Sequence, residues 1–419
     1  MNFLPTLPLA SNTLFFFGVL LLCGATGGYI THRWPWLPSI TGFMLVGLLA
    51  GPNVLNLVSY ATLAESRVII DVALGLILYR LGLTLDLKRL IHDRKLLLVS
   101  LVESTLTFMV VYGGMLLLQL DSLTAAVIAA LAVSSSPAVL IHVAHEMGAR
   151  GPVTERAKSL VALNNVIAFL LFSALLPLLY RQAKAPLATV LGGPAYALLG
   201  SILVGVVVGY VLHGAARLTK AAHQYQLALV VGAVSLTLGA TLSLKLSPLF
   251  APLVLGIVVR SIEHEDLVAD LEFGPAFELF FIALFVYAGA NMHLETMLTY
   301  APAIGVFLLG RFFAKWLGAG ITSRLQGVPT RQAATVGLLL IPMAGLAIGL
   351  VNTTGILFPQ ESVAVSSIVL AAVAILETIG PPIASKALRW SGDELRPDAS
   401  YESPPERPDS ATAAPSQST

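Results

Sequence analysis

Apolar runs of about twenty residues recur along almost the whole chain, a length that matches the ~30 Å hydrocarbon core of a bilayer. Only 11% of the 419 residues are charged, whereas a soluble domain carries about 25%. The shortfall is too large to reflect a buried core alone. The pattern predicts an all-α, polytopic membrane protein.

We expect about thirteen transmembrane helices, a number obtained by fitting membrane-length segments to the apolar runs. The predicted spans cover 13–31, 38–58, 66–85, 95–119, 122–146, 156–180, 187–214, 222–243, 246–261, 270–291, 300–323, 331–353 and 361–388. Residues 1–390 are predicted to form one membrane transporter domain. Residues 391–419 are rich in Pro, Ser and charge, and we expect a disordered cytoplasmic tail. The first helix is expected to be retained, because no basic segment of a cleavable signal peptide precedes it.

Lysine and arginine are distributed unevenly between the loops. The even-numbered loops hold only Arg67, Arg181, Lys184 and Lys245, and the odd-numbered loops hold the larger basic clusters. Cytoplasmic loops carry such an excess. The chain is therefore predicted to be a multi-pass protein of the inner (plasma) membrane, with its N-terminus outside and its C-terminus cytoplasmic.

A weak internal repeat relates the two halves. GLILYRLGLTLDL, ending at Leu87, aligns with IALFVYAGANMHL, ending at Leu294, and this places Gly82 on Gly289. SITGFMLVGLLAG from Ser39 resembles SPLFAPLVLGIVV from Ser247 in the same way. An odd number of predicted helices separates the copies, so the second copy is inserted upside down. Inverted repeats are typical of secondary transporters.

Two predicted spans contain a break in the middle. In the fifth span, Ser134, Ser135 and Ser136 precede Pro137, and in the twelfth, Pro342 and Met343 precede Gly345. Proline removes a backbone donor and clashes with the preceding turn. We expect the two broken helices to cross at mid-membrane, where freed backbone groups can coordinate an ion.

Ionisable residues also fall inside the spans, where they are costly unless paired or facing water. Glu103 in the fourth span corresponds by the repeat to the region of Arg311 and Lys315 in the eleventh. We therefore expect these two helices to cross with their charges facing inward. Four further charges lie in spans, and the first three are open to a structural role near an interface: Asp71, Arg80, Glu278 and Glu377.

No enzyme signature is present. The sequence contains no phosphate-binding loop and no His/Cys metal spacing, and the single Cys23 lies in the first apolar run. His142 and His145 are interpreted as residues of a solvated helix end, although histidine can sense pH. We predict no cofactor, no nucleic-acid partner, and no metal beyond a transported monovalent cation.

Six ordered segments resemble the monovalent cation/proton antiporter family, in the branch of sodium/proton and potassium/proton exchangers. They are TGFMLVGLLAGPNVLNLV, GARGPVTERAKSLVALNN, ALFVYAGANMHL, GRFFAKWLGAGITSRLQGVP, LLLIPMAGLAIGLV and ETIGPPIASKALRWSG. The resemblance implies a thirteen-helix fold with a dimerisation domain and a mobile core domain. It further implies elevator-type alternating access in a homodimer that exchanges Na⁺ or K⁺ for protons.

The sequence departs from the family at the ion site. The family carries an aspartate at the position of Asn164-Asn165, and its lysine at the position of Lys315 balances that charge; a Gln is common where Met343 stands. An amide offers an oxygen ligand but cannot carry the proton. The implied binding set is Asn164, Asn165, Ser134, Ser135, Ser136, Lys315, Glu103 and Met343.

Four interpretations of the Asn-Asn pair stay open. In the first, another carboxylate carries the proton (Glu103, Asp71 or Glu377), and in the second, Lys315 carries it. In the third, the protein moves a different solute, such as an anion attracted to Lys315, and in the fourth it is a transport-dead regulatory or sensor homologue.

Overall fold

The computed structural model describes residues 13–33, 39–59, 63–64, 66–83, 93–182, 187–218, 223–262, 275–292, 294–343, 345–357 and 359–393. Within these ranges the regular structure is entirely helical. The helices are α1 (Thr13–His32), α2 (Ser39–Ala50), α4 (Arg67–Leu83), α6 (Arg94–Leu117), α7 (Ser122–Val133), α8 (Pro137–Glu146), α9 (Pro152–Gln182), α10 (Leu187–Leu218), α11 (His223–Ser243), α12 (Phe250–Ile262), α13 (Pro275–Ala290), α14 (Leu294–Thr299), α15 (Ala301–Leu325), α16 (Thr330–Leu339), α17 (Gly345–Leu357) and α18 (Pro359–Ser391).

The all-helical, multi-pass membrane architecture is confirmed. Segments of α6, α9, α10, α11, α15 and α18 are long and apolar enough to cross a bilayer, and shorter apolar helices accompany them in the described part of the chain. The count of thirteen spans stays a prediction. The short α14 was not expected, and the tail predicted for 391–419 lies outside the described residues from 394 onward.

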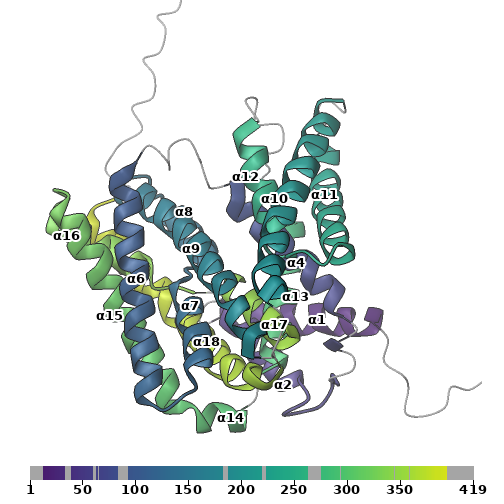
Figure 1. The fold of residues 1–419 in the computed structure, drawn as a ribbon, viewed down its shortest axis with the longest axis horizontal. Helices are drawn as coiled ribbons and strands as arrows, with labels where there is room; N and C mark the ends of the chain where they lie inside the picture. The colour runs from purple at the N-terminus through teal and green to yellow at the C-terminus, as the bar shows by residue number, and fades with distance from the viewer. Residues whose placement is uncertain are drawn as a thin grey trace, which may run out of the picture.

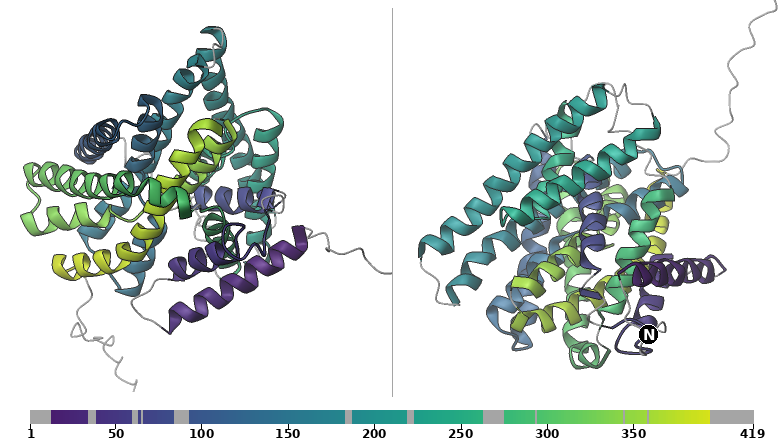
Figure 2. Two further views of the ribbon diagram at one scale, coloured as in Figure 1. Left: turned by 90° about the horizontal axis from the view of Figure 1, so that it is seen from below. Right: turned by 90° about the vertical axis from the view of Figure 1, so that its right-hand side faces the viewer.

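The helices pack as two groups, which Figure 1 shows on the left and right of the molecule, with α17 of the first group drawn beside the second. The site-bearing group consists of α6 to α9 and α15 to α18, and the second group consists of α1, α2, α4 and α10 to α13. Seen from below in Figure 2, the green α15 and α16 lie on the opposite side from the purple α1. The groups meet where α9 contacts α10, where α17 contacts α4 and where α18 contacts α2.

Glycine pairs set two close helix crossings in the second group. A Cβ on Gly256 of α12 would lie 2.1 Å from the Tyr79 carbonyl oxygen of α4, and one on Gly289 of α13 would lie 2.1 Å from the Met44 carbonyl oxygen of α2. Only glycine permits such an approach of two backbones. The repeat aligned Gly82 with Gly289, and both lie at these crossings, as a two-fold relation between the copies would require. The inverted topology itself stays a prediction.

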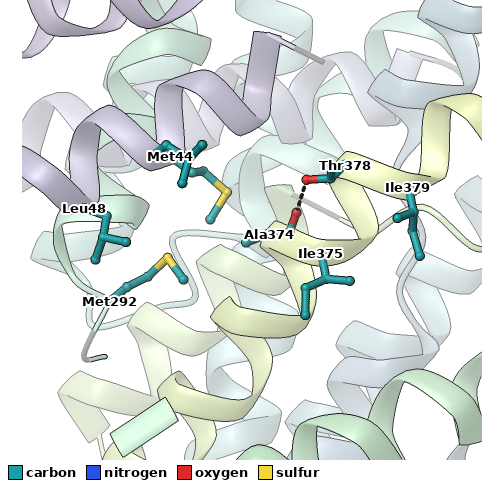
Figure 3. Close-up of a pocket in the computed structure, with 8 residues that line it drawn as sticks. Met44, Leu48, Met292, Ala374, Ile375, Thr378 and Ile379 are labelled. Carbon is teal, nitrogen blue, oxygen red and sulfur yellow. Dashed lines mark hydrogen bonds between the residues drawn. The ribbon is translucent and has the colours of Figure 1, made fainter. Parts of the chain in front are cut away.

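An apolar crevice lies along the seam between α2 and α18 (Figure 3). Met44 and Leu48 of α2 face Ile375 and Ile379 of α18 across it, and Met292 closes one end. Its polar side chain, Thr378, donates to the Ala374 carbonyl of its own helix at 2.8 Å. The crevice therefore offers no ligand for an ion.

The end of α18 is tied to the start of α9. Thr154 donates to one oxygen of Asp393 from its backbone N at 2.9 Å and from its hydroxyl at 3.0 Å. A carboxylate in this position satisfies free N–H groups of the first turn and complements the helix dipole. The last described residue of the chain thus holds the first turn of α9.

Candidate functional site

Two interrupted helices form the centre of the site-bearing group. The helix α7 ends at Val133 and α8 begins at Pro137, while α16 ends at Leu339 and α17 begins at Gly345. Both predicted breaks are therefore confirmed. They cross directly, because the Ser136 N donates to the Pro342 carbonyl at 2.8 Å and the Ser135 hydroxyl donates to the Leu340 carbonyl at 2.9 Å.

Arg311 of α15 holds the two breaks together. Its fully buried guanidinium donates to carbonyl groups of both: Ala132 at 2.9 Å, Ser134 at 2.7 Å, Leu340 and Pro342 at 3.4 Å each, and Ile341. The guanidinium is the one side chain with five N–H donors in a fixed planar array. Arg311 thus satisfies carbonyls that helix interruption would leave unpaired in an apolar environment.

Asn165 of α9 forms hydrogen bonds to the break between α7 and α8. Its Nδ2 donates to the Ser135 carbonyl at 2.8 Å, and its Oδ1 accepts from the Ser135 backbone N at 3.1 Å. The amide supplies one donor and one acceptor to the same residue, which a carboxylate cannot do. Asn165 therefore satisfies both the N–H and the carbonyl group of Ser135 within the break.

Lys315, one turn after Arg311, makes an ion pair with Glu103 of α6. Its Nζ lies 2.8 Å from the Glu103 Oε1 and also donates to the Val133 carbonyl at 2.7 Å. Thr107 donates to the same carboxylate oxygen at 3.1 Å. All of these atoms belong to fully buried side chains. The expected crossing of the fourth and eleventh spans with their charges inward is confirmed, and Lys315 is not left without a counter-ion.

Asn164 lies beside this ion pair. Its Oδ1 accepts from the hydroxyl of Ser100 at 2.8 Å and from that of Ser104 at 3.4 Å, whereas its buried Nδ2 has no hydrogen-bond partner. The side-chain amides of the two asparagines thus differ in their hydrogen bonding. Asn165 is satisfied at both ends, and Asn164 presents an unpartnered donor.

Glu377 of α18 is a second fully buried carboxylate near the crossing. It lies beside Ser136 and close enough to Arg311 for their charges to interact. Neither of its oxygens has a hydrogen-bond partner, and the Glu103 Oε2 likewise has none. Unpartnered carboxylate oxygens in a membrane interior are costly and point to a functional site.

The structure brings Ser134, Ser135, Ser136, Asn164, Asn165, Glu103, Lys315 and the buried Met343 into one region. Their roles as ligands stay predictions. The freed carbonyls differ from expectation: those of residues 132–135 and 340–342 already accept bonds from Arg311, Lys315, Asn165, Ser135 and Ser136. Side-chain oxygens are therefore the better candidate ion ligands.

Two predicted positions fall elsewhere, and three more have side chains that the structure does not describe. Asp71 and Arg80 lie in α4 of the second group, and each has an interaction partner. The side chains of Glu278, His142 and His145 lie outside the described residues. Sequence reasoning identified Glu377 as a buried charge but gave no reason to set it above the others. The signal was available, since Glu377 precedes the Gly-Pro-Pro of α18 by a single turn.

A helical membrane protein in which two interrupted helices cross beside buried, balanced charges has the architecture of a secondary transporter. The particular family follows from sequence comparison. Residues 17–386 match the family described as sodium/hydrogen exchanger, transmembrane, and the chain belongs to that family.

Solved structures share the fold. The sodium/proton antiporter MjNhaP1 of Methanocaldococcus jannaschii at pH 8 matches with a TM-score of 0.68 and 19% sequence identity, over 90% of this chain and 96% of that one. An electron-microscopy structure of the same antiporter gives a TM-score of 0.66 at the same identity and coverage. Comparison with curated proteins gives no match. Family and fold are those of transporters rather than enzymes, and they support cation/proton antiport in general.

Proposed function

We propose that this protein exchanges a monovalent cation, Na⁺ or K⁺, for protons by alternating access. The observation that carries the proposal is the charge balance at the crossing. Two buried cations, Arg311 and Lys315, are matched by two buried carboxylates, Glu103 and Glu377, although the usual acidic position is Asn164-Asn165. The site therefore keeps groups able to release a proton and offer hard oxygen ligands to a cation.

Transport of an anion attracted to Lys315 receives no support from this geometry. The Lys315 Nζ is already engaged by the Glu103 carboxylate and the Val133 carbonyl. The Arg311 donors are directed at backbone carbonyls. An anion entering the site would meet two carboxylates and no uncommitted cation among the described side chains.

Transport by purified protein in liposomes tests the proposal. A gradient of NaCl or KCl is imposed across vesicles that enclose a pH-sensitive dye, with choline chloride as the matched control. We expect a pH change with at least one of the two cations and none with choline. A protein that moves no protons with either cation is not an antiporter for them, and a regulatory or sensor role would then take precedence.

Three finer features belong to the same proposal. The protein acts as a homodimer, resides in the inner (plasma) membrane, and has its N-terminus outside. The excess of Lys and Arg in alternate loops supports the orientation. Cysteine labelling of single sites at residues 33 and 245, which lie in loops of opposite predicted sidedness, tests it directly: only one of the two should react from outside intact cells.

A further inference from the structure

Glu377 differs from the other buried charges in having no bonded partner. Glu103 receives hydrogen bonds from Lys315 and Thr107, and Arg311 and Lys315 donate to the carbonyls of the breaks. Glu377 is fully buried, and both of its carboxylate oxygens lack any hydrogen bond. An isolated ionised carboxylate is strongly disfavoured in such surroundings. Protonation or a bound cation would therefore stabilise this group.

The helix α18 brings this carboxylate to the crossing. A Cβ on Gly380, one turn after Glu377, would lie only 3.0 Å from the ring of Pro342, so α18 packs closely on the second break. Residues 374, 375, 378 and 379 line the apolar crevice, and helical geometry places position 377 on the other side of α18. Glu377 therefore lies on the face of α18 away from the crevice, toward Ser136 and Arg311 at the crossing.

The surroundings of Glu377 include a neighbouring hydroxyl group but no direct ion pair. Ser136, beside it, accepts a bond from the Val139 N at 3.4 Å, and its hydroxyl is close enough to the Glu377 carboxylate to interact with it. Arg311 is near enough to act on Glu377 by its charge. Its N–H groups, however, are directed at the carbonyls of the two breaks. Neither neighbour neutralises the carboxylate by direct contact.

We propose that Glu377 is the exchanging carboxylate, protonated in one state and a direct ligand of the monovalent cation in the other. This inference rests on the proposed antiport function and names the group that performs it. In the exchange, the O–H bond of Glu377 breaks, the proton passes to water in the open access path, and the cation takes its place. The charge of the crossing is the same with either occupant, so one proton competes with one cation.

The charged groups around Glu377 favour this assignment. From α15, Arg311 is close enough for its charge to act on Glu377, and Lys315 is paired with Glu103 of α6. The helices α2, α7 and α17 carry no titratable residue within their bounds, and the side chains of His142, His145 and Glu146 on α8 lie outside the described residues. On α14 and α16, Glu295 and Arg331 have exposed side chains. Among the described side chains packed on α18, Arg311 alone thus places a charge close to this carboxylate.

The experiment compares the full-length protein with Glu377→Gln, which keeps shape and removes the exchangeable proton. Purified protein is titrated with NaCl or KCl at several pH values, with choline chloride as control, and cation binding is followed by thermal stabilisation. Infrared difference spectra recorded on adding the cation report loss of a protonated carboxyl. We expect wild-type binding to weaken in acid, and Glu377→Gln to bind about tenfold more weakly or worse and to lack the infrared signal, because one interaction with a charged ligand is removed.

Two further variants keep the test decisive. Glu361→Gln, on the same helix, should behave as wild type. Glu377→Asp, which keeps the carboxyl on a shorter chain, should retain the infrared signal with altered affinity, and it serves if Glu377→Gln does not fold. A folded Glu377→Gln protein with wild-type binding and pH dependence overturns the inference while leaving antiport intact. If the wild-type protein transports no cation but still loses a carboxyl proton when the cation is added, the antiport function is overturned, while Glu377 as a cation-binding site is supported.

Discussion

The asymmetry between the two asparagines gives the sharpest prediction about the site. Asn165 uses its amide nitrogen to donate to the Ser135 carbonyl at 2.8 Å and its amide oxygen to accept from the Ser135 N at 3.1 Å. Asn165→Asp keeps the acceptor but removes the donor. It also places a carboxylate oxygen against a carbonyl oxygen within hydrogen-bond distance. Asn164→Asp does neither, because the Asn164 oxygen already accepts from two hydroxyl groups and its nitrogen has no partner.

The cost can be worked from these bonds. Leaving the buried Ser135 carbonyl without its donor costs about 1–3 kcal/mol, and the repulsion between the two oxygens adds to it. We expect Asn165→Asp to lower the free energy of unfolding by roughly 2–4 kcal/mol. Asn164→Asp buries a carboxyl group too but breaks no existing hydrogen bond, so we expect it to cost less than Asn165→Asp.

Thermal unfolding of the two purified variants at neutral pH, in one detergent, measures the difference. The two substitutions are adjacent, identical in chemistry and both buried, so each serves as the control for the other. The reasoning fails if Asn165→Asp is as stable as Asn164→Asp. Restored or altered cation dependence in Asn164→Asp would further indicate that the position next to Ser100 and Ser104 accepts an ion-site carboxylate.

The remaining predictions concern stability and use the same unfolding measurement. Glu103→Gln leaves the Lys315 ammonium buried without a counter-ion and should lower the free energy of unfolding by about 3–5 kcal/mol. Adding Lys315→Met to this variant should recover part of that loss. If the effects of the two substitutions simply add, the pair is not coupled. Gly256→Ala should destabilise the protein by about 1–3 kcal/mol, because the added Cβ would meet the Tyr79 carbonyl. The control Gly113→Ala places its Cβ in open space and should be neutral or stabilising. Equal effects of the two substitutions would refute the close crossing of α4 and α12. Asp393→Asn should cost about 0.5–2 kcal/mol because it weakens the capping of the N-terminus of α9. Added salt should narrow the stability difference between this variant and wild type, because salt screens the interaction of the Asp393 charge with the helix dipole.

Much of the fold could be predicted from the sequence because bilayer solvation imposes strong local signals. Apolar length and loop charge gave span positions close to the observed helices, for example 156–180 against Pro152–Gln182 in α9. Breaking residues at Pro137 and Pro342 located both interruptions. The match of Glu103 with the Arg311–Lys315 turn came from the repeat, since a buried charge needs a partner and the repeat limited which helices could supply it.

The hydrogen-bond arrangement at the crossing could not be predicted, because it depends on three-dimensional approach rather than local pattern. Nothing in the sequence shows that Arg311 would take up carbonyls from both breaks, or that Asn165 would bond the backbone of Ser135. These contacts decide which oxygens are left for an ion. Glu377 was one of several buried charges in sequence, and only its lack of partners in the structure separates it from the rest.

The Asn-Asn pair thereby acquires a physical explanation. A carboxylate at position 165 would conflict with the Ser135 carbonyl, so this version of the crossing requires an amide there. The lysine that needs a counter-ion finds it on α6, in Glu103, rather than on α9. That pairing occupies Glu103, because a buried carboxylate bound to an ammonium cannot release its partner without exposing an uncompensated charge. An exchange of protons for cations must then use a different carboxylate, and α18 supplies one at the same crossing with both of its oxygens unpartnered. The buried carboxylates of this crossing thus lie on α6 and α18 rather than on α9, and they equal the buried cations of α15 in number.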